Sequence, residues 1–315
     1  MKRLDFHERG VLRHALLAAL LFAPLVPSLA HACACGCGVF EVGTPAMFPT
    51  HSGGMLSLEY DFMDQDRNWS GAASAPASDN ADRRIRTHFV TAGVHYAFHP
   101  AWSASVEVPY WSRMFRTTDD DTGEIDAFTH GALGDVRVSG TFTGFSPDRS
   151  TGVSLGIKLP TGDHEYANFD RDTEIGTGST DALLGAYHVG SLGAARTWTW
   201  YLDGQYALPF AHSGDYEPGS EGDAAASVSY TGWKTGGATL APMLGLVGSV
   251  RARDAGSESD PDNSGYQRVL LAPGLDARFA GLRATLTVHV PLYEHVNGDQ
   301  LVAPALFKLV VGHAL

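Results

Sequence analysis

The three cysteines of this sequence, Cys33, Cys35 and Cys37, lie within five residues, with Gly36 and Gly38 beside them. Three thiolates next to glycines that let the backbone approach closely form a soft-ligand set suited to Cu or Zn. The sequence does not fix a fourth ligand. In an oxidising compartment an odd number of thiols also leaves one cysteine without an internal partner. The cluster therefore predicts a metal site, a disulfide, or a bond to a periplasmic partner, and leaves these alternatives open.

The residues before the cysteines have the pattern of an export signal. Basic residues precede an apolar run from Ala15 to Val26, and Ala30-His31-Ala32 places small residues at the spacing that a signal peptidase reads. We therefore predict a signal peptide over residues 1–32 and a Cys-rich segment over residues 33–54, in the periplasm or in the lumen of the domain that follows. Ala30 and His31 fit lipidation of Cys33 poorly.

Charged residues recur downstream at positions that alternate with apolar ones. If this polar face surrounds a lumen, opposing charges either orient a polar or zwitterionic solute through a transverse field or pair with one another and hold a narrow lumen shut. Both interpretations stay open. The predicted lumen charges are the acids Glu59, Asp61, Glu107, Asp135, Asp203 and Asp276 and the bases Arg137, Lys158, Arg251, Arg278, Arg283 and Lys308.

Three histidines are candidates for chemistry. His95 and His289 fall on the polar face and could meet in a lumen, but the sequence favours a surface or packing role for each. His88 is a candidate for a lipid-hydrolysing site, but no serine is paired with it by spacing, as acyl-transfer chemistry would require. We therefore expect no enzyme, with a lipid-acting enzyme as the weakest alternative.

These residues are positioned by strands. From Met55 onward, apolar and polar residues alternate with a period of two, which is the pattern of a strand with one apolar face. About 9–11 residues suffice for a tilted strand to cross a bilayer core. The predicted strands are residues 55–63, 87–98, 102–110, 135–145, 153–159, 182–189, 198–208, 224–233, 240–251, 269–279, 282–292 and 306–315.

The connections between these strands alternate between short and long. Short links lie near Pro100, Pro147, Gly193, Lys234 and Gly281, and the other connections are long and rich in Asp and Glu. Tight periplasmic turns and extended external loops are typical of an outer-membrane β-barrel. Two interpretations of this acidic rim stay open: it binds divalent cations shared with lipopolysaccharide phosphates, or it is simply the acidic surface of solvated loops. The net charge of −13 argues against a nucleic-acid partner.

A soluble β-sandwich is the structural alternative. Aromatic residues on the apolar faces argue against it, because they gather at strand ends as interfacial girdles do. Examples are Tyr60, Phe98, Trp102, Tyr110 and Trp198. The pattern favours an all-β, antiparallel transmembrane barrel of about 12 strands over residues 55–315.

One stretch also resembles a known family. Gly156-Ile-Lys-Leu-Pro-Thr-Gly-Asp163, followed by Gly176-Thr-Gly178 and Asp181, resembles the outer-membrane barrel family named after the meta-pathway of phenol degradation, whose members are described as transporters. The resemblance implies a channel for small solutes, hydrophobic or aromatic ones included, and no catalytic residues. The partners we expect are outer-membrane lipid, lipopolysaccharide and the solute. The alternative function is a metal-binding barrel that uses the cysteine cluster.

Overall fold

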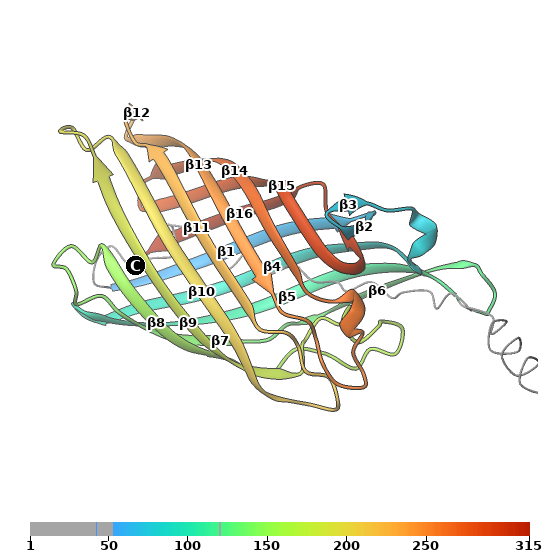
Figure 1. Cartoon of the computed structure of the whole chain (residues 1–315). Helices are drawn as coiled ribbons and strands as arrows, with labels where there is room; N and C mark the ends of the chain where they lie inside the picture. The colour runs from blue at the N-terminus through green and yellow to red at the C-terminus, as the bar shows by residue number, and fades with distance from the viewer. Residues whose placement is uncertain (1–41, 43–52, 120) are drawn as a thin grey trace, which may run out of the picture.

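The structure is a computed structural model that describes residues 42, 53–119 and 121–315. These residues form a closed antiparallel β-barrel with twelve strand positions around the ring (Figure 1), so the predicted fold class is confirmed. One of the twelve positions is shared by two short strands, β6 and β7, which both pair with β5. In ring order the strands are β1 (Gly53–Gln65), β4 (Asp82–His99), β5 (Trp102–Thr118), β6 (Ile125–Leu133) with β7 (Arg137–Phe142), β8 (Thr151–Lys158), β9 (Ser179–Leu192), β10 (Trp198–His212), β11 (Glu221–Tyr230), β13 (Ala238–Arg251), β14 (Tyr266–Phe279), β15 (Leu282–Val302) and β16 (Leu306–Ala314).

The ring closes between its first and last strands. β1 and β16 pair in an antiparallel register that runs from Met55 opposite Ala314 to Met63 opposite Leu306. The backbone N–H of Leu315 donates to the carbonyl of Gly54 at 2.8 Å. Closure removes the unpaired edges that an open sheet would expose.

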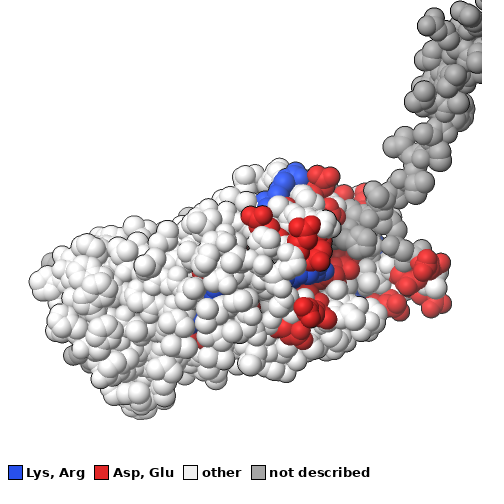
Figure 2. Space-filling model, turned by 90° about the horizontal axis from the view of Figure 1, so that it is seen from below, with Lys and Arg blue, Asp and Glu red and all other residues white. Residues whose placement is uncertain are grey.

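The two ends of the barrel differ. At the turn end, short connections join β4 to β5, β7 to β8, β9 to β10, β11 to β13 and β14 to β15, and the small strand β12 (Trp233–Thr235) lies here. At the loop end, long connections join β1 to β4, β8 to β9, β10 to β11 and β13 to β14. The first of these contains the hairpin of β2 (Arg67–Gly71) and β3 (Ala73–Ser74). Figure 2 shows acidic residues gathered at the loop end, while the other half of that face is almost uncharged.

Alternation along each strand separates an apolar outside from a polar inside. On β1 the outward Leu56 and Leu58 are 45% and 54% exposed, whereas the inward Glu59 and Asp61 are 6% and 2% exposed. Side chains alternate because successive Cβ atoms point to opposite faces of a sheet. Among the described residues, no helix is long and apolar enough to cross a membrane.

Part of the barrel interior is filled by apolar side chains. Met63, Phe89, Leu270 and Leu306 form a buried cluster inside the ring. Val42, the only described residue before Gly53, is buried in the same cluster. Gly53 and Gly54, the last two residues of the predicted Cys-rich segment, begin β1. The other residues of that segment, with Cys33, Cys35 and Cys37, and the predicted signal peptide lie outside the described residues.

Several strands differ from their predicted bounds. β15 continues from Leu292 to Val302, where a loop was expected, because its outer part pairs with the β2 hairpin after a register shift between Val296 and Asp299. The strand expected from Asp135 begins instead at Arg137, and β6 extends the same ring position toward the loop end. β11 ends at Tyr230, before the predicted Trp233, which starts the short β12.

Candidate functional site

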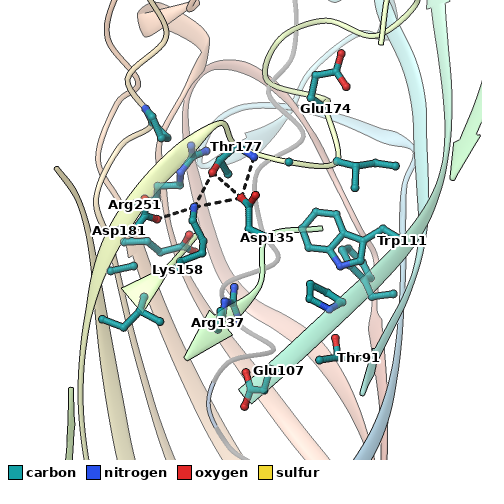
Figure 3. Close-up of a pocket in the computed structure, with 18 of the residues that line it drawn as sticks. Thr91, Glu107, Trp111, Asp135, Arg137, Lys158, Glu174, Thr177, Asp181 and Arg251 are labelled. Carbon is teal, nitrogen blue, oxygen red and sulfur yellow. Dashed lines mark hydrogen bonds and ion pairs between the residues drawn. The ribbon is translucent and has the colours of Figure 1, made fainter. Parts of the chain in front are cut away.

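The loop between β8 and β9, residues 159–178, folds inward at the loop end and is called the inner loop below. With inward residues of β1, β4, β5, β10 and β11 it encloses a cavity of about 140 Å³ (Figure 3). Phe89, Trp111, Ile175 and Leu183 supply apolar parts of the wall. The remaining wall is largely charged, so the cavity can accommodate an apolar body beside ionic groups.

Lys158, the last residue of β8, forms a buried ionic group at the base of the inner loop. Its Nζ lies 2.7 Å from Asp181 Oδ2 and 3.6 Å from Asp135 Oδ2. It also donates to Thr177 Oγ1 at 2.6 Å. One cation is therefore shared by two carboxylates (Figure 3), and charge-assisted hydrogen bonds of this kind are the strong ones in proteins.

Asp135 holds both ends of the inner loop. Its Oδ1 accepts from the N–H of Gly162 at 2.9 Å, and its Oδ2 accepts from the N–H of Thr177 at 3.0 Å and from Thr177 Oγ1 at 2.7 Å. Asp135 leaves the sheet to do this, which is why β7 begins only at Arg137.

Two glycines let the ends of the inner loop cross closely. A Cβ added to Gly176 would lie 2.4 Å from the carbonyl carbon of Gly162, so neither position has room for a side chain. The stretch that carries the family resemblance, from Gly156 to Asp163 and from Gly176 to Asp181, is thus a lock. It fixes the inner loop to the barrel wall.

The middle of the inner loop has a second attachment, to Arg113 of β5. This buried side chain donates from Nη1 to the carbonyl of Glu174 at 2.9 Å and from Nε to Thr87 Oγ1 at 2.9 Å. Phe169 packs edge-on against Phe115, with ring centroids 5.8 Å apart.

The inner loop also packs on β6. His130 stacks on Tyr166 with ring centroids 4.1 Å apart, and its Nε2 lies 2.7 Å from Asp163 Oδ2. That hydrogen bond lowers the pKa of Asp163. The inner loop is therefore attached at its two ends by Asp135, and along its length by Arg113 and His130.

Glu174 is the buried carboxyl group of the inner loop, and it gives the loop a pH dependence. Burial raises the pKa of Glu174 to about 7, against an ordinary value near 4.3 in an unfolded chain. Because the folded state binds this proton more tightly, its stability falls as the pH rises from about 4.3 to about 7 and changes no further above that. We expect protection factors of inner-loop amides in hydrogen exchange to be on the order of tenfold higher at pH 5 than at pH 8.

Glu174→Gln should remove most of that difference. Glu165→Gln, which alters an exposed carboxyl of the same loop, is the matched control and should leave it in place. An unchanged pH dependence in Glu174→Gln would contradict this assignment.

A second ionic group lies deeper in the lumen. Lys308 Nζ contacts Glu59 Oε1 at 2.9 Å, and Asp61 lies opposite Lys308 in the register of β1 and β16. Glu107 lies opposite Arg137 between β5 and β7. Thus five of the predicted lumen charges lie on β7, β5, β1 and β16, within five consecutive strand positions of the ring.

The remaining predicted charges lie nearer the two ends. Arg283 Nε and Arg278 Nε contact Asp276 at 2.6 Å and 2.9 Å at the turn end. Asp203 lines a cavity on the turn side of the lumen. Arg251 Nη2 contacts Asp254 Oδ1 at 2.6 Å near the loop end. All twelve predicted positions face inward or border a lumen cavity.

The three candidate histidines lie at different places in the barrel. His95 lines a cavity on the turn side, and His289 shares a hydrogen bond with Thr287 at 3.0 Å. His88 lies on the outer surface, where its Nδ1 is 2.9 Å from the Tyr60 hydroxyl and its ring is 5.0 Å from that of Phe62. These partners place His88 among surface aromatic residues.

Several inward polar residues were missed from the sequence. Arg113, Asp181, Asp223 and Arg268 lie one to three residues beyond the ends of the predicted strands. They keep the inward parity of those strands. Extending each alternating run by three residues at both ends would have included them.

The predicted Cu or Zn site at the cysteines lies outside the described residues. Within residues 53–119 and 121–315, no group of three or more His, Cys, Asp or Glu side chains is arranged to hold a metal ion.

Comparisons with known proteins support the fold. No protein-family model and no curated protein matches the sequence. A solved outer membrane channel from Pseudomonas putida F1 is similar over 87% of this chain and 100% of its own, with a TM-score of 0.65 and 13% identity. The β-domain of the Bordetella autotransporter BrkA gives a TM-score of 0.48 at 11% identity, covering 84% of this chain and 100% of its own. A Pseudomonas aeruginosa FadL homologue gives 0.43 at 9%, covering 86% and 95%. At such identities the likeness to the Pseudomonas putida channel shows a shared barrel fold.

Proposed function

We propose that this protein spans the outer membrane and conducts small, mainly apolar solutes, aromatic ones included, through its lumen. The observation that carries the proposal is the apolar outer surface of a closed ring around a polar interior that contains cavities. In hydrocarbon only a closed barrel or a helix satisfies every backbone hydrogen bond. We orient the turn end toward the periplasm and the loop end outward, because outer-membrane barrels have short periplasmic turns.

A row of cavities supports a conduit. Glu107 and Gln205 border both the cavity under the inner loop and a second cavity of about 120 Å³ on its turn side. Tyr187 borders that second cavity and a third of about 510 Å³ at the turn end. Adjoining cavities along the axis are what a stepwise path for a small molecule requires.

The walls favour a solute with an apolar body. Trp111 and Phe89 present aromatic surface, with ring centroids 4.7 Å apart, to the cavity under the inner loop. The similar Pseudomonas putida protein is described as an outer membrane channel, which agrees with this function. Lumen charges that pair with one another, such as Lys308 with Glu59, leave the apolar wall to contact the solute.

Solute entry into vesicles tests the proposal. Vesicles whose outer leaflet contains lipopolysaccharide, reconstituted with the barrel, should admit a small fluorescent aromatic alcohol several-fold faster than protein-free vesicles. Ala207→Trp, which adds bulk inside the cavity, should slow entry toward the protein-free rate. Ala104→Trp, a matched change on the outer face of β5, should not. Equal entry with wild type, with Ala207→Trp and without protein would refute a conducting lumen.

A further inference from the structure

The cavity of about 510 Å³ at the turn end differs in charge from the rest of the lumen. It is called the vestibule below. Its wall contains five basic and two acidic residues, whereas the cavity under the inner loop has nine acidic and five basic residues. The charge of the lumen therefore changes sign along the barrel axis. The charged residues of the vestibule are Asp148, Arg149, Arg196, Lys234, Asp276, Arg278 and Arg283.

The two acids of the vestibule do not neutralise its bases. Asp276 is occupied by Arg278 and Arg283, and it also accepts from Thr285 Oγ1 at 2.8 Å. Asp148 accepts from the backbone N–H of Ser150 at 3.1 Å in its own turn. Among the described residues, Arg149, Arg196 and Lys234 form no ion pair, so three positive charges border the vestibule without a counter-charge.

The backbone of Arg149 is fixed by its turn and by a hydrogen bond. Its φ of 55° lies in the left-handed region, and its carbonyl accepts from the Tyr187 hydroxyl at 3.3 Å. Nη1 of its guanidinium is buried without a hydrogen-bond partner among the described residues. Arg196, at the neighbouring turn, has a φ of 51°. L-residues adopt this conformation at a cost, and it persists where the surrounding structure or a function requires it.

The vestibule also has an apolar side. Tyr187, Val189, Tyr201 and Met243 line it, and both tyrosines are buried. A volume of this size suits a small molecule. Guanidinium groups bind carboxylate and phosphate oxygens through paired N–H donors, and the ammonium of Lys234 adds a point charge.

We propose that the vestibule is a binding site for small organic oxyanions, in which the carboxylate or phosphate group lies against Arg149, Arg196 and Lys234 and the apolar body lies against Tyr187 and Met243. The inference deepens the proposed channel function, since it names a solute class for the periplasmic end of the conduit. Binding can nevertheless be measured without transport.

The test uses the full chain in detergent and three ligands of matched shape: benzoate, phenyl phosphate and the neutral benzyl alcohol. Calorimetric titration at low ionic strength should show binding of at least one anion about tenfold or more tighter than benzyl alcohol. The tighter of the two anions identifies the preferred oxyanion. Added salt should weaken anion binding, as it does for partly exposed charges.

Variants complete the test. The triple change Arg149→Gln, Arg196→Gln and Lys234→Gln should reduce anion affinity about tenfold or more and leave benzyl alcohol binding unchanged. Arg253→Gln, an exposed arginine of a long loop, is the control and should bind like wild type. The triple variant must keep the circular dichroism and heat-shifted gel mobility of a folded barrel, and Arg149→Gln alone serves if it does not.

Two results would overturn the proposal: equal affinity for the anions and benzyl alcohol, or unchanged anion affinity in a folded variant. Anion binding without solute entry into vesicles would reject the channel function and keep the vestibule site. Solute entry without anion binding would reject the vestibule site and keep the channel function.

Discussion

Leu246→Arg is expected to destabilise the barrel by about 2–4 kcal/mol in a lipid bilayer, because the change places a charge on the apolar surface near the middle of a strand. Leu246 lies within β13 and is 46% exposed on the outside of the ring. Urea unfolding of protein refolded into vesicles, followed by tryptophan fluorescence, measures the change in the free energy of unfolding.

Ala252→Arg is the matched control, since this exposed residue follows directly after β13 and lies at the loop end, outside the apolar belt. It should change stability by no more than about 0.5 kcal/mol, as is usual for exposed surface positions. Equal stability of both variants and wild type would mean that the outside of the ring does not face lipid, and the membrane location would fail with it.

Lys158→Met is expected to cost about 3–5 kcal/mol, because removing one partner of a buried ionic group leaves the others uncompensated. Here two carboxylates, Asp135 and Asp181, would lose their shared cation. The inner loop should then leave the wall. Hydrogen exchange at the amides of Gly162 and Thr177, which now donate to Asp135, should accelerate before that of the strands.

The double variant Lys158→Met with Asp181→Asn should recover part of the loss, because it removes one of the stranded charges. Lys234→Met, which alters an exposed lysine at the turn end, should leave inner-loop exchange unchanged. If Lys158→Met exchanged like wild type, the lock would not depend on this ionic group.

The barrel could be predicted from the sequence because apolar and polar residues alternate with a period of two in every strand that has lipid on one face and a polar lumen on the other. On β1 the alternation from Leu56 to Phe62 reports directly which side chains face outward. In the structure Lys308 and Glu59 are buried, and each alternates along its strand with exposed apolar neighbours.

The alternation of polar and apolar residues failed to predict β6, because the inner loop, and not a polar lumen, contacts the inward side chains of this strand. On β6 the inward residues are Phe128 and His130, because Tyr166 and Phe169 of the inner loop cover them. An apolar inward face cancels the alternation, so this strand could not be recognised. The lock itself joins Asp135 to Gly162 and Thr177, contacts that no local spacing reveals.

The seam between β1 and β16 has a consequence for folding kinetics. Its pairs, such as Leu58 with Val311, have nearly the largest sequence separation that the chain allows, which raises the relative contact order and slows closure. Until the last strand arrives, the backbone donors and acceptors of β1 on that side form an exposed template for association with other chains. We therefore expect aggregation during refolding to compete with this final step, and a ligand that shields the edge of β1 to raise the yield of native protein.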